Sequence, residues 1–149
     1  MGTLEASWTV EIAAPREHCY EIAADVEGAP KWQGTLEEVD TITRDSEGRP
    51  ELVHTVSDAM VKKVKSEVRF SYDPPQGIRW EQESGDAKSL TGWWDFEELE
   101  EGKTRATYGL RTDPGRVLGM MLRGPVEGKV KELLTRSAAE GLKTEAESG

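Results

Sequence analysis

The sequence is poor in cysteine, with Cys19 as the single one among 149 residues. A chain with one cysteine cannot form an internal disulfide, whereas small secreted domains usually depend on several such bridges. We therefore expect a protein of a reducing compartment, with the cytoplasm as the default location. Cys19 itself is expected to be a small buried residue and not a nucleophile, because its helix offers no obvious base facing it.

Basic charge and long apolar runs are also scarce. The chain has 19 basic and 29 acidic residues, which gives a net charge of −10. The average field of such a chain repels nucleic-acid phosphates and anionic membrane surfaces, so neither is an expected partner. The longest apolar run, from Val117 to Leu122, is far too short to cross a bilayer, and the acidic N-terminal segment has no apolar signal region. We therefore expect no integral membrane association.

Catalytic and metal-binding motifs are missing as well. The sequence has no Gly-x-Ser-x-Gly, no His-Glu-x-x-His, no phosphate loop and no Cys-x-x-Cys. Hydrolase, metalloprotease and nucleotide-binding functions therefore find no support. His18 and His54 are the only histidines, and they fall on different expected elements. A zinc site would need further nitrogen or sulfur ligands, so we predict no metal site and no cofactor.

What the sequence does contain is alternation. From Leu4 to Ile12 every second residue is apolar, which predicts a half-buried strand. A short helix is predicted from Pro15 to Val26, followed by a turn of helix or a loop at Lys31 and Trp32. Six further strands, separated by turn residues, are predicted at 35–44, 50–58, 61–72, 78–84, 90–99 and 104–112.

Parity assigns the faces of most of these strands. The inward positions are Trp8, Val64, Val68, Phe70, Tyr72, Ile78, Trp80, Trp94, Phe96, Ala106, Tyr108 and Leu110. Trp93 points outward by the same rule. The register of 35–44 and 50–58 stays open. In 50–58 two sets of residues compete for the inner face, Val53, Thr55 and Ser57 against Leu52, His54 and Val56, and a bulge would shift them.

The last part of the chain has helical periodicity. Apolar residues recur at spacings of three and four, at Leu118, Leu122, Val126, Val130, Leu133, Leu134, Ala138 and Leu142. Gly124 and Pro125 should break the run, because proline removes a backbone donor. We predict a short helix at 114–123, with Asp113 as its N-cap, and a long helix at 125–146. Lys131 is expected on the solvated side of the long helix, and residues 144–149 are expected to fray.

These elements predict one α+β domain over residues 1–149. A seven-stranded antiparallel sheet, with two short helices after its first strand, curls its apolar face around the long C-terminal helix. The chain resembles the helix-grip superfamily of START proteins, birch-pollen allergens and polyketide cyclases/dehydrases (SRPBCC). The resemblance covers about residues 4–146. It rests on the segment from Ala13 to Val26 with Pro30-Lys31-Trp32, on the strands containing 92–96 and 104–108, and on the closing helix.

The resemblance implies a cavity between the sheet and the long helix that holds a small apolar or aromatic molecule. Members include lipid carriers, hormone receptors and ring-closing enzymes, so the fold does not fix the activity. The first hypothesis is binding or carriage of a lipid-like or polyketide-like ligand. It requires a cavity of about 300 Å³ or more. The expected ligand-binding residues are Trp32, Phe70, Tyr72, Trp80, Trp94, Phe96, Tyr108, Met120, Met121 and Val126.

Two other hypotheses stay open at this point. An enzyme resembling aromatic polyketide cyclases or dehydratases would need a positioned acid or base, for which the candidates are His54, Asp58, Tyr72 and Tyr108. An interaction module would instead use the outer face of the sheet around Trp93. The sequence does not predict the oligomeric state.

Overall fold

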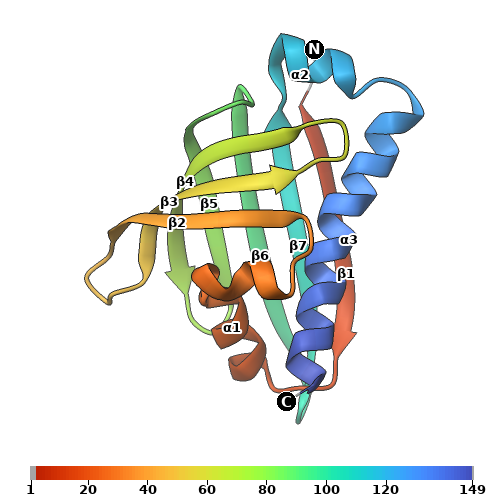
Figure 1. The fold of residues 1–149 in the computed structure, drawn as a ribbon. Coiled ribbons are helices and arrows are strands. Elements are labelled where there is room, and N and C mark those ends of the chain that lie inside the picture. Colours follow the sequence, from red (N-terminus) through yellow and green to blue (C-terminus); the bar gives the residue numbers. More distant parts are fainter. Residues whose placement is uncertain (1–2, 149) are drawn as a thin grey trace.

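The computed structural model describes residues 3–148. Its elements are β1 (Leu4–Ile12), α1 (Arg16–Ala24), the 3-10 helix η1 (Val26–Lys31), β2 (Leu36–Arg44), β3 (Pro50–Asp58), β4 (Lys63–Asp73), β5 (Gly77–Gly85), β6 (Ser89–Glu100), β7 (Lys103–Asp113), α2 (Gly115–Met121) and α3 (Pro125–Ser148). The predicted helix-grip architecture is confirmed. A curved antiparallel sheet of seven strands carries short helices after β1 and is covered by the long helix α3 (Figure 1).

The sheet has the strand order β1-β7-β6-β5-β4-β3-β2. Strands β2 to β7 follow one another as hairpins, and β1 joins the free side of β7. The β1–β7 pair keeps one register from Leu4 opposite Thr112 to Ile12 opposite Thr104. The β2–β3, β4–β5 and β6–β7 pairs contain register shifts. Such irregularities bend strands, and they help the sheet to curl over α3.

Helix α3 starts where the sequence predicts a break. Gly124 has a φ of 62°, a left-handed conformation that glycine tolerates well, and Pro125 opens the helix. The helix packs mainly along β1 (Figure 1). Its buried residues are Val130, Thr135, Ala138, Ala139, Leu142 and Ala146.

The predicted buried position of Leu133 is wrong, because its side chain is 36% exposed. Leu133 lies nine positions before the fully buried Leu142, and at roughly 100° per residue this places the two side chains on opposite sides of the helix. Lys131 was expected on the solvated side, but it is half-buried. Leu134 is also half-buried.

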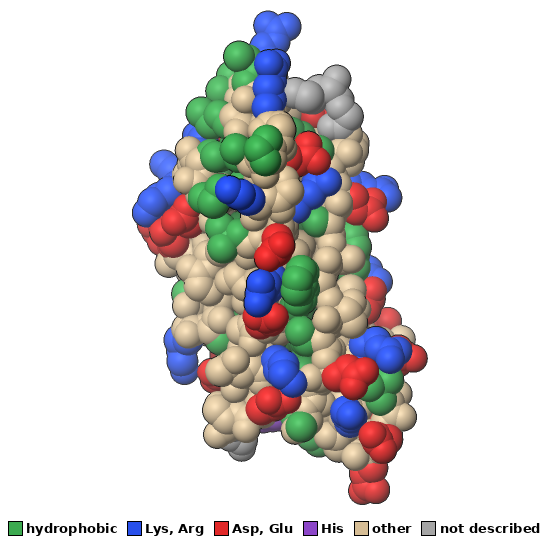
Figure 2. Space-filling view, turned by 90° about the vertical axis from the view of Figure 1, so that its right-hand side faces the viewer, with side chains coloured by type: hydrophobic (Ala, Val, Ile, Leu, Met, Phe, Trp, Pro, Cys, Tyr) green, Lys and Arg blue, Asp and Glu red, His purple; other side chains and the backbone are tan. Residues whose placement is uncertain are grey.

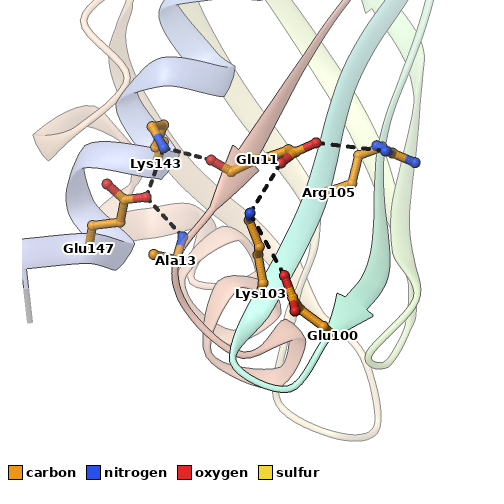
Figure 3. Close-up of polar contacts among 7 residues, drawn as sticks. All are labelled: Glu11, Ala13, Glu100, Lys103, Arg105, Lys143 and Glu147. Carbon is orange, nitrogen blue, oxygen red and sulfur yellow. Dashed lines mark hydrogen bonds and ion pairs between the residues drawn. The ribbon is translucent and has the colours of Figure 1, made fainter.

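The C-terminal end of α3 is attached to the end of β1 (Figure 3). Lys143 Nζ donates a hydrogen bond of 2.6 Å to the carbonyl oxygen of Glu11. A carboxylate oxygen of Glu147 accepts a hydrogen bond of 2.9 Å from the backbone N–H of Ala13 and lies 2.8 Å from Lys143 Nζ. Ala146 is buried. The predicted fraying is therefore wrong for residues 144–148, and Gly149 lies outside the described residues.

The core lies between the sheet and α3, and α1 covers its lower end (Figure 1). Tyr20 and Cys19 from α1 are buried there against Phe96, whose ring centroid lies 6.1 Å from that of Tyr20. Within residues 3–148, no helix is both long enough and apolar enough to cross a membrane.

Candidate functional site: a cavity between the sheet and α3

An internal cavity of about 190 Å³ lies between the inner face of the sheet and α3. At one end it is lined by Leu118 and Leu122, from α2 and the residue after it, together with Lys131 on α3. At the other end the lining includes Ala29 and Trp32 from the η1 region. The volume is smaller than the 300 Å³ that the sequence analysis required, so the expected size was wrong.

One wall of the cavity is a continuous series of aromatic rings. The ring centroids of Phe70 and Trp80 are 5.4 Å apart, and those of Trp80 and Tyr108 are 5.6 Å apart. Trp94 follows at 4.9 Å from Tyr108, and Trp32 lies 6.1 Å from Trp94. All five residues line the cavity, as predicted from parity for the four strand residues. Rings in tilted and edge contacts of this kind make a rigid apolar surface.

A glycine lets this wall lie close to the sheet. A Cβ atom at Gly92 on β6 would overlap the indole ring of Trp80 on the neighbouring strand β5. Only the lack of a side chain at residue 92 leaves room for that indole. Gly92 therefore sets the depth of the cavity at its aromatic wall.

A few polar groups also face the cavity. Gln33 and Thr35, in the loop between η1 and β2, are buried and line it together with Ser57 of β3. Burial raises the pKa of Tyr108 to about 12, although the neighbouring side chain of Gln33 acts in the other direction. The phenol of Tyr108 is therefore protonated at neutral pH and can donate a hydrogen bond.

The structure resolves the open register of β3. Val53 is fully buried, and Thr55 and Ser57 line the cavity opposite Ser66 and Val64 of β4. The sequence does not predict this polar part of the lining, because both faces of 50–58 carry apolar residues. Gln33 and Thr35 lie in a loop and have no periodic signal at all.

Two predicted cavity residues lie in the core instead. Phe96 is 4% exposed and stacks on Trp94 with ring centroids 5.6 Å apart, but it does not line the cavity. Tyr72 stacks on Phe70, and its hydroxyl donates a hydrogen bond of 2.6 Å to the carbonyl oxygen of Pro50. Burial raises the pKa of Tyr72. Tyr72 thus has an intramolecular partner and lies outside the cavity lining.

The expected placement of Met120, Met121 and Val126 at the cavity is also wrong. Met120 is 57% exposed and Met121 is 41% exposed. None of the three residues lines the cavity. At roughly 100° per residue, Met120 lies about 160° around α2 from Leu118 and so points away from the cavity. Met121 lies only about 60° from Leu118, but it ends the helix and is exposed.

Two acid–base candidates lie away from the cavity. His54 alternates with Val53 and Thr55, so it lies on the outer face of β3, opposite Glu67 and Asp40. Asp58 ends β3, where its carboxylate accepts a hydrogen bond of 2.9 Å from the backbone N–H of Met60. That contact explains an aspartate at this tight turn. Of the four candidates, Tyr108 alone lines the cavity.

Charged side chains meet the cavity at its α2 end. Lys131 Nζ lies 3.0 Å from a carboxylate oxygen of Glu127, one helical turn earlier on α3. Glu5 on β1 also contributes to the lining, and it pairs with Arg111 at 2.8 Å. Each acid therefore has a basic partner. Burial raises the pKa of the Cys19 thiol, and among residues 3–148 no three His, Cys, Asp or Glu side chains come together as a metal site needs.

The outward position of Trp93 fits the parity argument. It borders a shallow hollow on the outer face of the sheet. A Cβ atom at Gly109 of the neighbouring strand would overlap the Trp93 ring, so the indole lies flat against its own sheet and is only half-exposed. This packing gives Trp93 an intramolecular role, and binding through the outer face stays a hypothesis.

The curved sheet closed by one long helix over an apolar cavity defines a helix-grip protein. The sequence matches the model of the polyketide cyclase / dehydrase and lipid transport family over residues 3–147, and the chain belongs to this family. The predicted resemblance is thus confirmed. No curated protein matches the sequence.

Solved structures share the fold over almost the whole chain. A START superfamily protein from Mycobacterium smegmatis has a TM-score of 0.84 at 20% identity, with 99% of each chain covered. A protein from Thermus thermophilus has a TM-score of 0.83 at 25% identity, covering 96% of this chain and 97% of that one. An aromatase/cyclase from a Streptomyces species has a TM-score of 0.83 at 19% identity, with coverages of 98% and 94%.

Proposed function

We propose that this protein binds a compact molecule of one or two rings with a polar substituent in the cavity between the sheet and α3. The observation that carries the proposal is the aromatic wall from Phe70 to Trp32 around an internal volume of about 190 Å³. Apolar burial drives binding to such a site, and a few convergent polar groups set the orientation.

The volume limits the size of the ligand. Apolar cavities of about 150 Å³ are known to hold benzene. The cavity of about 190 Å³ is somewhat larger than that. A one-ring or two-ring molecule fits this limit. A phospholipid or a long polyketide chain does not fit unless the cavity widens.

The polar groups favour a ligand that is not a pure hydrocarbon. Hydroxyl and amide groups in an apolar cavity are costly unless they find partners. Gln33, Thr35, Ser57 and the protonated Tyr108 line the same cavity. A hydroxyl, carbonyl or carboxyl substituent on the ring would accept a hydrogen bond from this part of the lining.

Tryptophan fluorescence offers a direct test, because Trp32, Trp80 and Trp94 line the cavity. The purified protein is titrated with 2-naphthol, naphthalene and palmitate, and organic extracts of gently purified protein are analysed by mass spectrometry. We expect saturable binding of 2-naphthol, weaker binding of naphthalene and no binding of palmitate. If palmitate alone bound tightly, the size limit would be contradicted. If none of the three probes bound and the organic extract contained no ligand, the proposal itself would be contradicted.

Three variants locate the site. Ser57→Phe should abolish binding, because it places a ring in the cavity and Ser57 makes no side-chain hydrogen bond with the described residues. Tyr108→Phe should weaken 2-naphthol binding about fivefold, the value of one ordinary hydrogen bond, and leave naphthalene binding unchanged. Tyr72→Phe is the matched control, because its hydroxyl bonds Pro50 and not the cavity. Equal effects of the two tyrosine substitutions would place the ligand elsewhere.

A further inference from the structure

Helix α2 forms an isolated tip at one end of the molecule (Figure 1). Its first residue, Gly115, has a positive φ of 80°, and Gly124, just before α3, has a φ of 62°. No strand or other helix packs extensively against it within the described residues. Its inner residue Leu118 is buried and lines the cavity, together with Leu122 just beyond the helix. The tip is thus a thin layer between the cavity and the surroundings.

The outer side of this tip is apolar as well. Val117 is 69% exposed, Met120 57% and Met121 41%. Exposed apolar side chains that occur singly are normal on a protein surface. Here three exposed apolar side chains lie on one helix of seven residues, and the inner side of that helix is apolar as well. Val117, Met120 and Met121 therefore form an apolar patch that no other part of the described chain covers. Figure 2 shows hydrophobic side chains gathered towards the upper end of this face, with basic side chains projecting around them.

The segment that carries the patch has a net charge of the opposite sign to that of the whole chain. Residues 114–131 contain four basic residues and one acidic residue, Glu127, which pairs with Lys131 at 3.0 Å. Arg116, Arg123 and Lys129 form no ion pair with any residue in 3–148. Charges further away than about 8–10 Å are screened at physiological salt, so the local charge governs contacts at the tip despite the net charge of −10.

We propose that the α2 tip docks on the surface of an anionic phospholipid bilayer, with Val117, Met120 and Met121 among the headgroups and Arg116, Arg123 and Lys129 against the phosphates. Apolar side chains with basic neighbours are the combination that holds short helices in a membrane interface. A projecting tip suits a deformable surface better than a preformed protein pocket. The net charge alone predicts repulsion from such membranes, and the distribution of charge reverses that expectation at this one site.

Docking would bring the α2 end of the cavity against the membrane, where apolar compounds concentrate. Leu118 and Leu122 would then separate the bilayer from the cavity by a single layer of side chains. This proposal goes beyond ligand binding and does not depend on it, because vesicle binding and ligand titration are measured separately.

Vesicle co-sedimentation of the full chain tests the docking surface. Vesicles of phosphatidylcholine are compared with vesicles containing about 30% phosphatidylglycerol, at 25 mM and 500 mM NaCl. We expect binding to the anionic vesicles at low salt, and much weaker binding at high salt or to phosphatidylcholine alone. Arg116→Ser with Arg123→Ser should weaken partitioning about 25-fold, at roughly fivefold per charge. Val117→Ser with Met120→Ser should weaken it about tenfold.

Two control variants remove the same kinds of side chain elsewhere. Ile42→Ser removes an apolar residue that is 49% exposed on β2, and Lys31→Ser removes an exposed basic residue of η1. Both should bind vesicles like the unmodified protein. The α2 substitutions are on the surface, so thermal melts should show that all variants fold. The proposal is overturned if the unmodified protein does not bind anionic vesicles at low salt, which is the result expected of a tip that recognises an acidic protein instead. It is also overturned if all variants bind the vesicles equally.

Discussion

Gly141 lies where α3 approaches the backbone of Trp32 closely, and replacing it tests how α3 packs against the rest of the protein. A Cβ atom at this residue would overlap the carbonyl oxygen of Trp32 and lie 3.0 Å from its carbonyl carbon. The obstacle is backbone, so it cannot rotate away as a side chain can. Hydrogen bonds also hold the turn in place, from the N–H of Gln33 to the carbonyl of Ala29 at 2.8 Å and from the N–H of Leu36 to the carbonyl of Gln33 at 2.9 Å.

The size of the effect follows from two opposing contributions. Overpacking of this severity lies near the upper end of the usual range, about 3 kcal/mol, while alanine gains about 1 kcal/mol over glycine in a helix. Gly141→Ala should therefore lower the free energy of unfolding by about 2 kcal/mol. Gly128→Ala is the matched control on the same helix, because a Cβ atom there meets nothing within 4 Å. It should raise the free energy of unfolding by about 0.5–1 kcal/mol.

Urea denaturation and thermal melts of the two variants measure this contrast directly. The melting temperatures should differ by about 5–12 °C, since the two effects differ by about 2.5–3 kcal/mol and 1 kcal/mol corresponds to about 2–4 °C in a domain of this size. Gly141→Ala should also weaken 2-naphthol binding, because Trp32 lines the cavity. If both variants were stabilised alike, α3 would not lie against the Trp32 turn, and the cavity that it closes would have a different shape.

Two further predictions concern α3. A backbone hydrogen bond from Ala13 and the ion pair with Lys143 lower the pKa of Glu147. The stabilisation is therefore present above the ordinary glutamate pKa and is lost as the pH falls through the lowered value. Glu147→Gln should lower the free energy of unfolding by about 1 kcal/mol at pH 7 and by almost nothing at pH 2, as measured by urea melts at both pH values. A loss that does not depend on pH would rule out the carboxylate contact. Leu142→Ala, at a fully buried position, should lower the free energy of unfolding by about 2–5 kcal/mol. Leu133→Ala should lower it by about 0.5 kcal/mol or less. Similar losses for both variants in denaturant melts would show that α3 is rotated about its axis.

The strands were predictable because one physical signal determined each of them. In β1 and in β4 to β7, apolar residues alternate with polar ones, so parity alone identified the inward side of Trp80, Trp94 and Tyr108. In β3, apolar residues occur at both parities, and pairing with β4 decides between them. Thr55 faces the cavity because it lies opposite Ser66, which is information that residues 50–58 alone do not contain.

The helical errors have a different cause. Spacings of three and four between apolar residues indicate a helix, but they do not determine which of these apolar residues contact the sheet. The stripe of α3 drifts around the helix axis, so Leu133 leaves it before Leu142 enters it. Met120 and Met121 were assigned to the cavity from their flexibility and proximity to the helix entrance, yet a short helix presents only one side to the cavity, and Leu118 occupies that side.

The titratable side chains that line the cavity bear on the hypothesis of ring-closing catalysis. Ring closure or dehydration of a polyketide needs a group that accepts a proton. Tyr108, with a pKa of about 12, retains its proton at neutral pH. Among the described residues that line the cavity, the carboxylates are Glu5 and Glu127, and each forms an ion pair at the α2 end. The deep part of the cavity offers hydrogen-bond donors and aromatic surface, which are the groups that the proposed binding of a polar ring compound uses.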